Sequence, residues 1–196
     1  MEKAPATSSS IKPDEAYERI LTTNLQRAID FVRFAEAKNA ALLALASAWV
    51  VAIINLKCSG KTMPDRLAMG ITLALLFSLC AGLLAMLSFM PRLHLPWFLG
   101  GKRAGPHPHN LLYFGDISRL PIKTLEQDFP LRYFPDSEGY KGAYFHDLLV
   151  QISVNSEIAM RKMVVFRWGI GLIVVAGLIL LVPVIEMAFE SVKRAW

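Results

Sequence analysis

The chain has 196 residues, 54% of them hydrophobic, and its formal net charge is +5. A mean hydropathy of +0.40 is too high for an ordinary soluble domain and is typical of a small membrane protein with several spans. The basic excess suits contact with an anionic lipid surface. Because the basic residues form no stripe, we expect no binding to DNA or RNA.

The N-terminal part of the chain predicts a tail followed by a long helix. Residues 1–13 are small and polar and are expected to form a disordered tail. From 14 to 38, apolar residues recur at spacings of three and four, which predicts an amphipathic cytoplasmic helix. Because no glycine or proline occurs between Asp14 and Leu56, this helix is expected to continue into a first membrane span over 39–57.

Two further apolar segments, 67–90 and 164–187, are long enough to cross a bilayer core of about 30 Å. The polar segment 91–163 lies between them and is expected to act as a cytoplasmic sensor segment. The predicted fold is therefore all-α: a three-span integral membrane protein whose two long helices extend into a cytoplasmic helical stalk. Its contact with the lipid bilayer follows directly.

Within the sensor segment, a short helix is predicted around 122–128. Pro130, Pro135 and Gly139 then predict a loop. Helical spacing resumes near Tyr144 and continues into the third span, which predicts a second long helix.

Lysine and arginine set the expected orientation. They are concentrated in the N-terminal segment and in 91–163, whereas the loop between the first two spans holds only Lys57, Lys61 and Arg66. The positive-inside rule therefore places the N-terminus and the sensor segment in the cytoplasm and the C-terminus outside. Lys193 and Arg194 argue mildly against the last point. The N-terminal segment lacks the apolar core of a cleaved signal peptide.

An alanine occurs at every fourth position of the first span, at Ala40, Ala44, Ala48 and Ala52. Small residues at this spacing let helix backbones approach closely in lipid. Two interpretations stay open: the alanine ladder forms the interface of a homo-oligomer, or it packs against the chain's own second or third span.

The chain carries no catalytic signature such as His-Glu-x-x-His or Gly-x-Ser-x-Gly, so we do not expect an enzyme or a cofactor. His107 and His109 sit beside prolines with no third ligand nearby, which argues against a metal site. Gly100–Gly105 lacks the Gly-Lys-Ser/Thr of a phosphate-binding loop, and its Lys102 and Arg103 are expected to contact lipid phosphates.

A group of aromatic, amide and basic residues could form a nucleotide-binding site. Aromatic rings can stack on a base, amides can bind its edge, and arginine can bind a phosphate. The alternative, which composition favours, is a structural aromatic cluster at the top of the stalk. The candidate residues are Asn110, Tyr113, Phe114, Arg119 and Arg132.

Three segments resemble the Pycsar transmembrane effector family, and the similarity extends over residues 14–187. They are NLQRAIDFVRFAEAKNAALL from Asn24 to Leu43, NLLYFGDI from Asn110 to Ile117, and LLVQISVNSEIAMRK from Leu148 to Lys162. The resemblance implies a protein of the bacterial inner membrane that takes part in antiphage defence. A partner cyclase makes cyclic CMP or cyclic UMP, and the effector senses it and impairs the membrane, which causes abortive infection.

A cyclic mononucleotide needs a cation for its phosphate and an aromatic ring for its base. We expect Arg119 or Arg132 to bind the phosphate and Tyr113 or Phe114 to stack on the base. Two other functions stay open: a membrane effector that senses a cyclic oligonucleotide, and a structural membrane subunit without a ligand.

Overall fold

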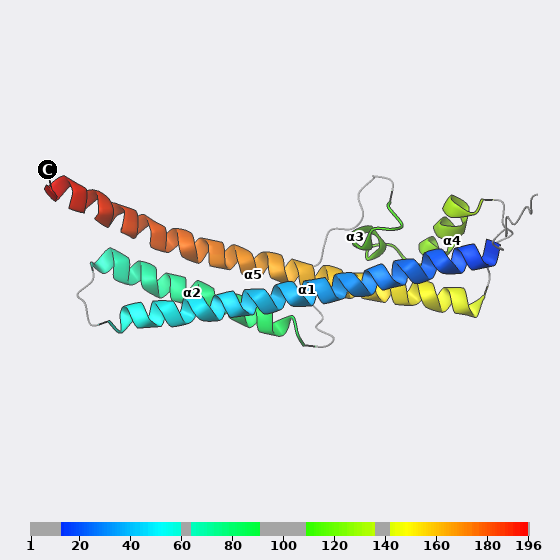
Figure 1. Cartoon of the computed structure of the whole chain (residues 1–196), viewed down its shortest axis with the longest axis horizontal. Coiled ribbons are helices and arrows are strands. Elements are labelled where there is room, and N and C mark those ends of the chain that lie inside the picture. Colours follow the sequence, from blue (N-terminus) through cyan, green and yellow to red (C-terminus); the bar gives the residue numbers. More distant parts are fainter. Residues whose placement is uncertain (1–12, 60–63, 91–108, 136–141, 196) are drawn as a thin grey trace, which may run out of the picture. The chain divides into compact units, whose positions relative to one another are not determined.

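The computed structural model describes residues 13–59, 64–90, 109–135 and 142–195. Helices are the only regular secondary structure of these residues, which confirms the all-α prediction for the described part of the chain (Figure 1). The helices are α1 (Pro13–Lys57), α2 (Asp65–Leu87), α3 (Phe114–Ile117), α4 (Ile122–Tyr133) and α5 (Ala143–Ala195). Residues 1–12 of the predicted tail, the Gly100–Gly105 segment and His107 lie outside the described residues.

The chain divides into two compact units that share two helices. Unit 1 consists of Met1–Val32 and Lys102–Met160, and unit 2 consists of Arg33–Gly101 and Arg161–Trp196. Helices α1 and α5 each contribute residues to both units, whereas α2 belongs to unit 2 and α3 and α4 belong to unit 1. The uninterrupted helix predicted from Asp14 to Leu56 is confirmed as α1.

One local prediction is wrong. Pro130 was expected in a loop, but it lies inside α4, which continues to Tyr133. Proline has no N–H for the carbonyl four residues earlier, so it usually interrupts a helix. Here Leu125 and Phe129, four residues apart, are both fully buried on one face of α4. Their burial keeps the helix intact for one further turn, which ends where the Phe134 N–H donates to the Pro130 carbonyl at 2.8 Å.

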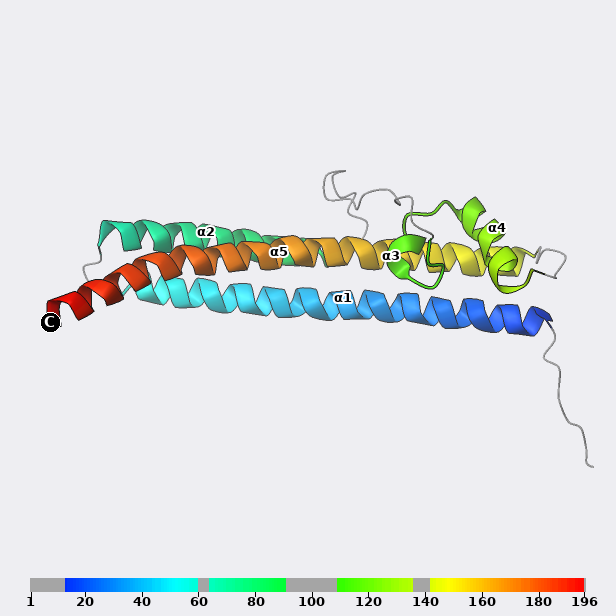
Figure 2. The same cartoon turned by 90° about the horizontal axis from the view of Figure 1, so that it is seen from above.

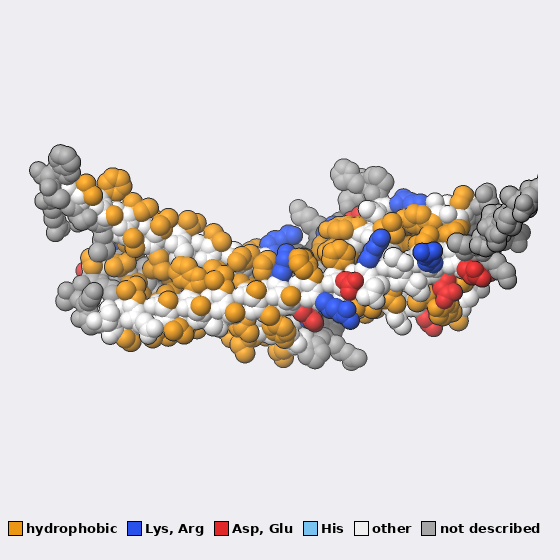
Figure 3. Space-filling view, viewed as in Figure 1, with side chains coloured by type: hydrophobic (Ala, Val, Ile, Leu, Met, Phe, Trp, Pro, Cys, Tyr) orange, Lys and Arg blue, Asp and Glu red, His pale blue; other side chains and the backbone are white. Residues whose placement is uncertain are grey.

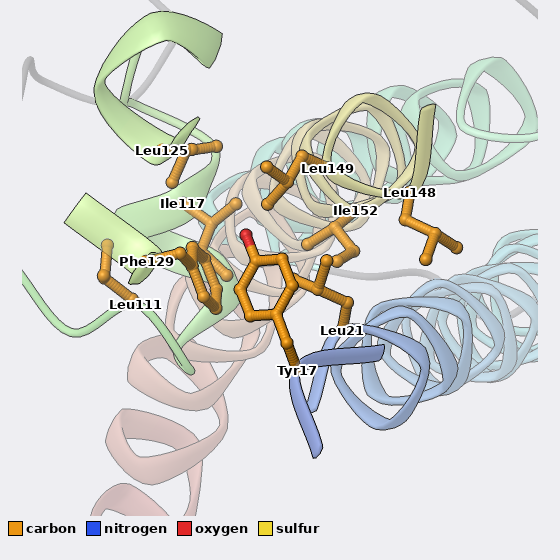
Figure 4. Packing of buried hydrophobic residues seen from close by; sticks show 9 residues of the cluster. All are labelled: Tyr17, Leu21, Leu111, Ile117, Leu125, Phe129, Leu148, Leu149 and Ile152. Carbon is orange, nitrogen blue, oxygen red and sulfur yellow. The ribbon is translucent and has the colours of Figure 1, made fainter. Parts of the chain in front are cut away.

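The core of unit 1 joins four helices and the segment before α3. Figures 1 and 2 show α1 and α5 side by side through this unit, with α3 and α4 against one side of the pair. Close packing of aliphatic and aromatic side chains holds them together (Figure 4). The core residues are Tyr17 and Leu21 from α1, Leu111 and Ile117, Leu125 and Phe129 from α4, and Leu148, Leu149 and Ile152 from α5.

Unit 2 is a bundle of α1, α2 and α5. These are three helices long and apolar enough to cross a membrane, as the sequence predicted. Hydrophobic side chains are spread along the whole bundle surface that Figure 3 shows. Exposed hydrophobic side chains are favourable in a membrane, because they contact the acyl chains of the lipids there.

Small residues on α2 let the three helices of unit 2 approach closely. Its buried face is formed by Gly70, Ile71, Ala74, Ser78, Ala81 and Ala85. A Cβ placed on Gly82 would lie 3.7 Å from the Cβ of Ala46 on α1. On α5, a Cβ placed on Gly169 would lie 2.4 Å from Cδ2 of Leu42, so a larger residue there would require the Leu42 side chain to move. The close-packed seam inside the chain therefore runs along α2.

The alanine ladder of α1 lies on a different face. Ala40, Ala44, Ala48 and Ala52 are all exposed, whereas the buried face of this part of α1 carries Leu42, Ala46 and Ile53. The interpretation that the ladder packs against the chain's own spans is therefore wrong. Small residues at four-residue spacing occur on both α1 and α2. The spacing alone therefore does not show which of the two faces packs inside the chain and which lies on its outside.

Gly70 has a second role, at a proline inside α5. Pro183 cannot donate a hydrogen bond to the Ile179 carbonyl, which lies four residues earlier. A Cβ on Gly70 would stand 3.5 Å from this carbonyl oxygen and 3.7 Å from Cγ of Pro183. Both distances are ordinary van der Waals contacts, so α2 at Gly70 packs directly on a carbonyl that would be costly to expose to lipid.

We predict that Ala81→Leu lowers the thermal stability of the protein in detergent, whereas Ala68→Leu does not. Ala81 is fully buried, and forcing a larger side chain into a packed core costs about 1–3 kcal/mol. Ala68→Leu makes the same substitution at an exposed position of the same helix, α2, and serves as the matched control. Equal melting temperatures for the two variants would contradict the assignment of the seam to α2.

Candidate functional site

The candidate nucleotide-binding residues lie in unit 1, on α3, on α4, in the segment that precedes α3 and, for Arg119, in the turn between the two helices. This segment is anchored to α1 by a buried hydrogen bond, in which Nδ2 of Asn24 donates to the Leu111 carbonyl at 3.0 Å. Both residues are buried, and Leu111 also belongs to the hydrophobic core. A buried amide that binds a backbone carbonyl fixes the position of that carbonyl, because leaving it without a partner would be costly.

Asn110 and Asp116 shape the turn that carries the candidate residues. Oδ1 of Asn110 accepts a hydrogen bond from the Leu112 N–H at 2.9 Å, which is an Asx turn. Oδ2 of Asp116 accepts from the Asn110 N–H at 3.0 Å. The carbonyl oxygen of the Asn110 side chain is therefore already engaged in holding the backbone. Asn110 itself is exposed.

The two aromatic candidates have different surroundings. Phe114 is only 7% exposed, and its ring centroid lies 4.3 Å from that of Phe31 on α1. A base could stack on Phe114 only if Phe31 moved away. Tyr113 is 46% exposed and contacts Phe114 edge to face at 5.0 Å. Its ring lies over Gly115, where a Cβ would come within 2.5 Å of Cε1 of Tyr113.

The two arginine candidates also differ. Nη1 of Arg132 donates a hydrogen bond to the His109 carbonyl, so this side chain holds the beginning of the segment. Arg119 is exposed, and among the described residues its side chain has no hydrogen-bond or ion-pair partner. The structure therefore brings the five candidates onto one anchored segment and its neighbour α4, and it leaves Tyr113 and Arg119 with the most accessible functional groups.

Asn24 is a residue of this region that the sequence analysis did not select. It lies among the apolar residues on the inward face of α1 and is 3% exposed. The signal was present in the sequence, because a polar residue at an apolar register position of an amphipathic helix needs a buried partner. The sequence did not indicate that this partner is a backbone carbonyl 87 positions away along the chain.

Two polar contacts tie the first turns of α5 to the rest of unit 1. The Tyr144 hydroxyl donates to Oε1 of Glu18 at 2.7 Å, and this hydrogen bond raises the pKa of Tyr144 above 10.0. Nδ1 of His146 pairs with Oε1 of Glu126 on α4, and this pairing raises the pKa of His146 above 6.5. Among the described residues, no group of three or more His, Cys, Asp or Glu side chains is placed to hold a metal ion.

The described residues include three helices able to cross a membrane, and two of them, α1 and α5, also form part of unit 1. The protein is therefore a multi-pass membrane protein with a second helical unit. Residues 20–189 match the model of the Pycsar effector protein domain. The chain is also 38% identical over 171 residues to the Pycsar effector protein RsPycTM of a Rhizobium species, which covers 83% of this chain and 91% of that protein. No solved structure matches the chain. The chain therefore belongs to the Pycsar effector transmembrane family of antiphage defence, as the three sequence segments indicated.

We predict that the pair of His146 and Glu126 makes the stability of the protein depend on pH. Because the folded state raises the pKa of His146, the stabilisation is complete below 6.5 and is lost as the pH rises through the raised value. The melting temperature in detergent should fall over this window. In His146→Gln, which keeps a polar side chain without a titrating group, the fall should be smaller. Identical pH profiles for the two proteins would contradict a stabilising pair.

Proposed function

We propose that this protein senses a cyclic pyrimidine mononucleotide, cyclic CMP or cyclic UMP, and responds by impairing the inner membrane of the bacterium. A partner cyclase supplies the nucleotide during phage infection, and the membrane damage ends phage production through abortive infection. The observation that carries this proposal is the match to the Pycsar effector domain over residues 20–189, which includes both units. The protein is not proposed to catalyse a reaction.

The proposed ligand site is the exposed surface around Tyr113 and Arg119 in unit 1. A cyclic mononucleotide carries one negative charge and one flat base, so it needs a cation and an aromatic ring. Tyr113 offers a ring with nearly half of its surface exposed, and Arg119 offers an exposed guanidinium. Asn110, Phe114 and Arg132 complete the candidate set, with hydrogen bonds or ring packing that support the segment.

A ligand on this segment would act directly on α1. The Leu111 carbonyl is bound by Asn24, and the Phe114 ring packs on Phe31, so two contacts join the segment to that helix. Helix α1 continues without interruption from these residues into unit 2, where it forms one of the three candidate spans. A displacement of α1 is therefore the proposed signal from the ligand to the bilayer.

The proposed location is the inner membrane, with the N-terminus and unit 1 in the cytoplasm. This orientation rests on the concentration of lysine and arginine in the N-terminal segment and in 91–163. It also gives unit 1 access to a nucleotide made in the cytoplasm. The domain limits predicted above, with spans over 39–57, 67–90 and 164–187, form part of this proposal.

The proposed function is tested by titrating the purified protein in detergent with cyclic CMP, cyclic UMP, cyclic AMP and cyclic GMP. We predict binding of a pyrimidine nucleotide and an affinity about tenfold or more weaker for Arg119→Ala, since a hydrogen bond to a charged group contributes about 1.5–3 kcal/mol. Because Arg119 is exposed, its removal should leave the melting temperature unchanged. Arg19→Ala, at another exposed arginine of unit 1, is the control and should bind normally.

Two results would count against this account at different levels. If none of the four nucleotides binds to the unchanged protein, the sensing function itself is wrong. If Arg119→Ala and Arg132→Ala both bind with unchanged affinity, the function stands and the phosphate site lies elsewhere. Arg33, Lys38 and Arg161, at the start of unit 2, are then the next candidates.

We also propose that the protein is a homo-oligomer whose subunits meet at the exposed alanine ladder of α1. Ala44→Leu combined with Ala48→Leu should separate the backbones and reduce the oligomer size measured in detergent, together with toxicity in cells. Ala68→Leu makes the same change on an exposed position of α2 and should leave both unchanged. An unaltered oligomer that remains toxic would place the ladder against lipid.

A further inference from the structure

Four residues connect the three helices of unit 2 at the end where α1 and α5 enter it. They are Glu36 and Asn39 on α1, Ser88 at the C-terminus of α2, and Lys162 on α5, and they are called the polar junction below. Unit 2 begins at Arg33 in α1 and at Arg161 in α5. The polar junction therefore occupies the first two turns of each shared helix inside unit 2.

Lys162 is the centre of the polar junction. Its Nζ donates to Oε1 of Glu36 at 2.8 Å and to the Ser88 carbonyl at 3.2 Å. The backbone carbonyl of Lys162 accepts a hydrogen bond from Nδ2 of Asn39 at 3.0 Å. One residue of α5 is thus bound to both other helices, through its ammonium group and through its backbone.

The polar junction is covered around Lys162 but not fully satisfied. The Lys162 side chain is 16% exposed and Asn39 is completely buried, whereas the Glu36 side chain is 46% exposed. Within the described part of the chain, Oδ1 of Asn39 and Oγ of Ser88 have no hydrogen-bond partner. A covered polar network with unpaired atoms holds helices together less firmly than apolar side chains of the same size would. Such a network suits a contact that has to break.

The polar junction supports a closed arrangement of the three-helix bundle of unit 2. Beyond the junction, the centre of the bundle is filled by Leu42, Ala46, Ala81, Ala85 and Ile173. A Cβ on Gly169 would meet Cδ2 of Leu42 at 2.4 Å, so α1 and α5 lie close together at that level. The centre that these five residues form is apolar while Lys162 contacts α1 and α2.

We propose that the polar junction is a switch that keeps the membrane bundle closed, and that separating Lys162 from Glu36 and Ser88 opens it. A displacement of α1 against α5 at the start of unit 2 changes the distance between Glu36 and Lys162 directly, since each residue lies on one of these helices. The link from nucleotide binding to this separation rests on the proposed function. The closing role of the junction itself does not.

The test uses the full-length protein in lipid vesicles loaded with a fluorescent dye, without any nucleotide. Lys162→Met keeps an unbranched side chain of similar size and removes its charge, which leaves the Glu36 carboxylate and the Ser88 carbonyl without their donor. Removing one partner of such a pair is destabilising, so dye release should rise about tenfold or more above that of the unchanged protein. Glu36→Gln should raise it in the same direction. Lys162→Arg preserves the charge and should remain as tight as the unchanged protein.

A matched control lies elsewhere in the same bundle. Arg66 on α2 and Glu186 on α5 also form an ion pair between two helices, at 3.6 Å, but both side chains are largely exposed. Exposed pairs contribute little to stability. Arg66→Met and Glu186→Gln should therefore leave dye release unchanged, which separates the polar junction from a general effect of removing charge.

The outcomes distinguish the switch from the proposed function. Basal leakage from Lys162→Met and Glu36→Gln, with tight vesicles for Lys162→Arg, supports the switch even if no nucleotide affects the unchanged protein. Vesicles of Lys162→Met and Glu36→Gln that stay as tight as those of the unchanged protein overturn it. Glu36→Gln is the milder change, and its melting temperature and inserted fraction show whether leakage reflects opening or loss of the fold. Leakage that accompanies loss of the fold in both variants also overturns the proposal.

Discussion

The continuity of α1 and α5 is the constraint on which the rest of the structure depends. In lipid, backbone N–H and C=O groups need partners within the protein, and a helix supplies nearly all of them inside its own segment, so each span favours a long continuous helix. Here two of the three spans continue as the main helices of unit 1. The membrane bundle and the proposed sensor unit are therefore built on the same two backbones, and a force on either helix in unit 1 acts on a helix of unit 2 without an intervening loop.

Buried polar side chains fix these helices at two levels. In unit 1, Asn24 positions the segment before α3 through the Leu111 carbonyl. In unit 2, Asn39 binds the Lys162 carbonyl, and Lys162 in turn binds Glu36. Apolar packing gives each unit its stability, whereas hydrogen bonds of this kind specify which residues face each other, because their geometry admits one register. The proposed switch includes Asn39, and the proposed site lies on the segment that Asn24 holds in place.

The sequence predicted the parts of this structure that depend on local rules. The absence of glycine and proline from Asp14 to Leu56 predicted α1 correctly, and hydrophobic length predicted three spans. The errors came from packing between distant segments. Pro130 remains helical because Leu125 and Phe129 are buried, and the internal seam follows α2 because its partners on α1 and α5 fit it. For the site, the sequence selected accessible groups such as Tyr113 and Arg119, but it gave no indication that Phe114 would be covered by Phe31.

The central claim is that three helices cross the inner membrane and leave unit 1 in the cytoplasm. The most direct measurement uses topology reporters, one fused after Trp196 and one inserted at Pro106, in a chain that otherwise retains its sequence. The account predicts periplasmic activity for the reporter after Trp196 and cytoplasmic activity for the reporter at Pro106. Cytoplasmic activity of both reporters would mean that α5 does not cross the membrane as a single span between these two positions, which would contradict the three-span account.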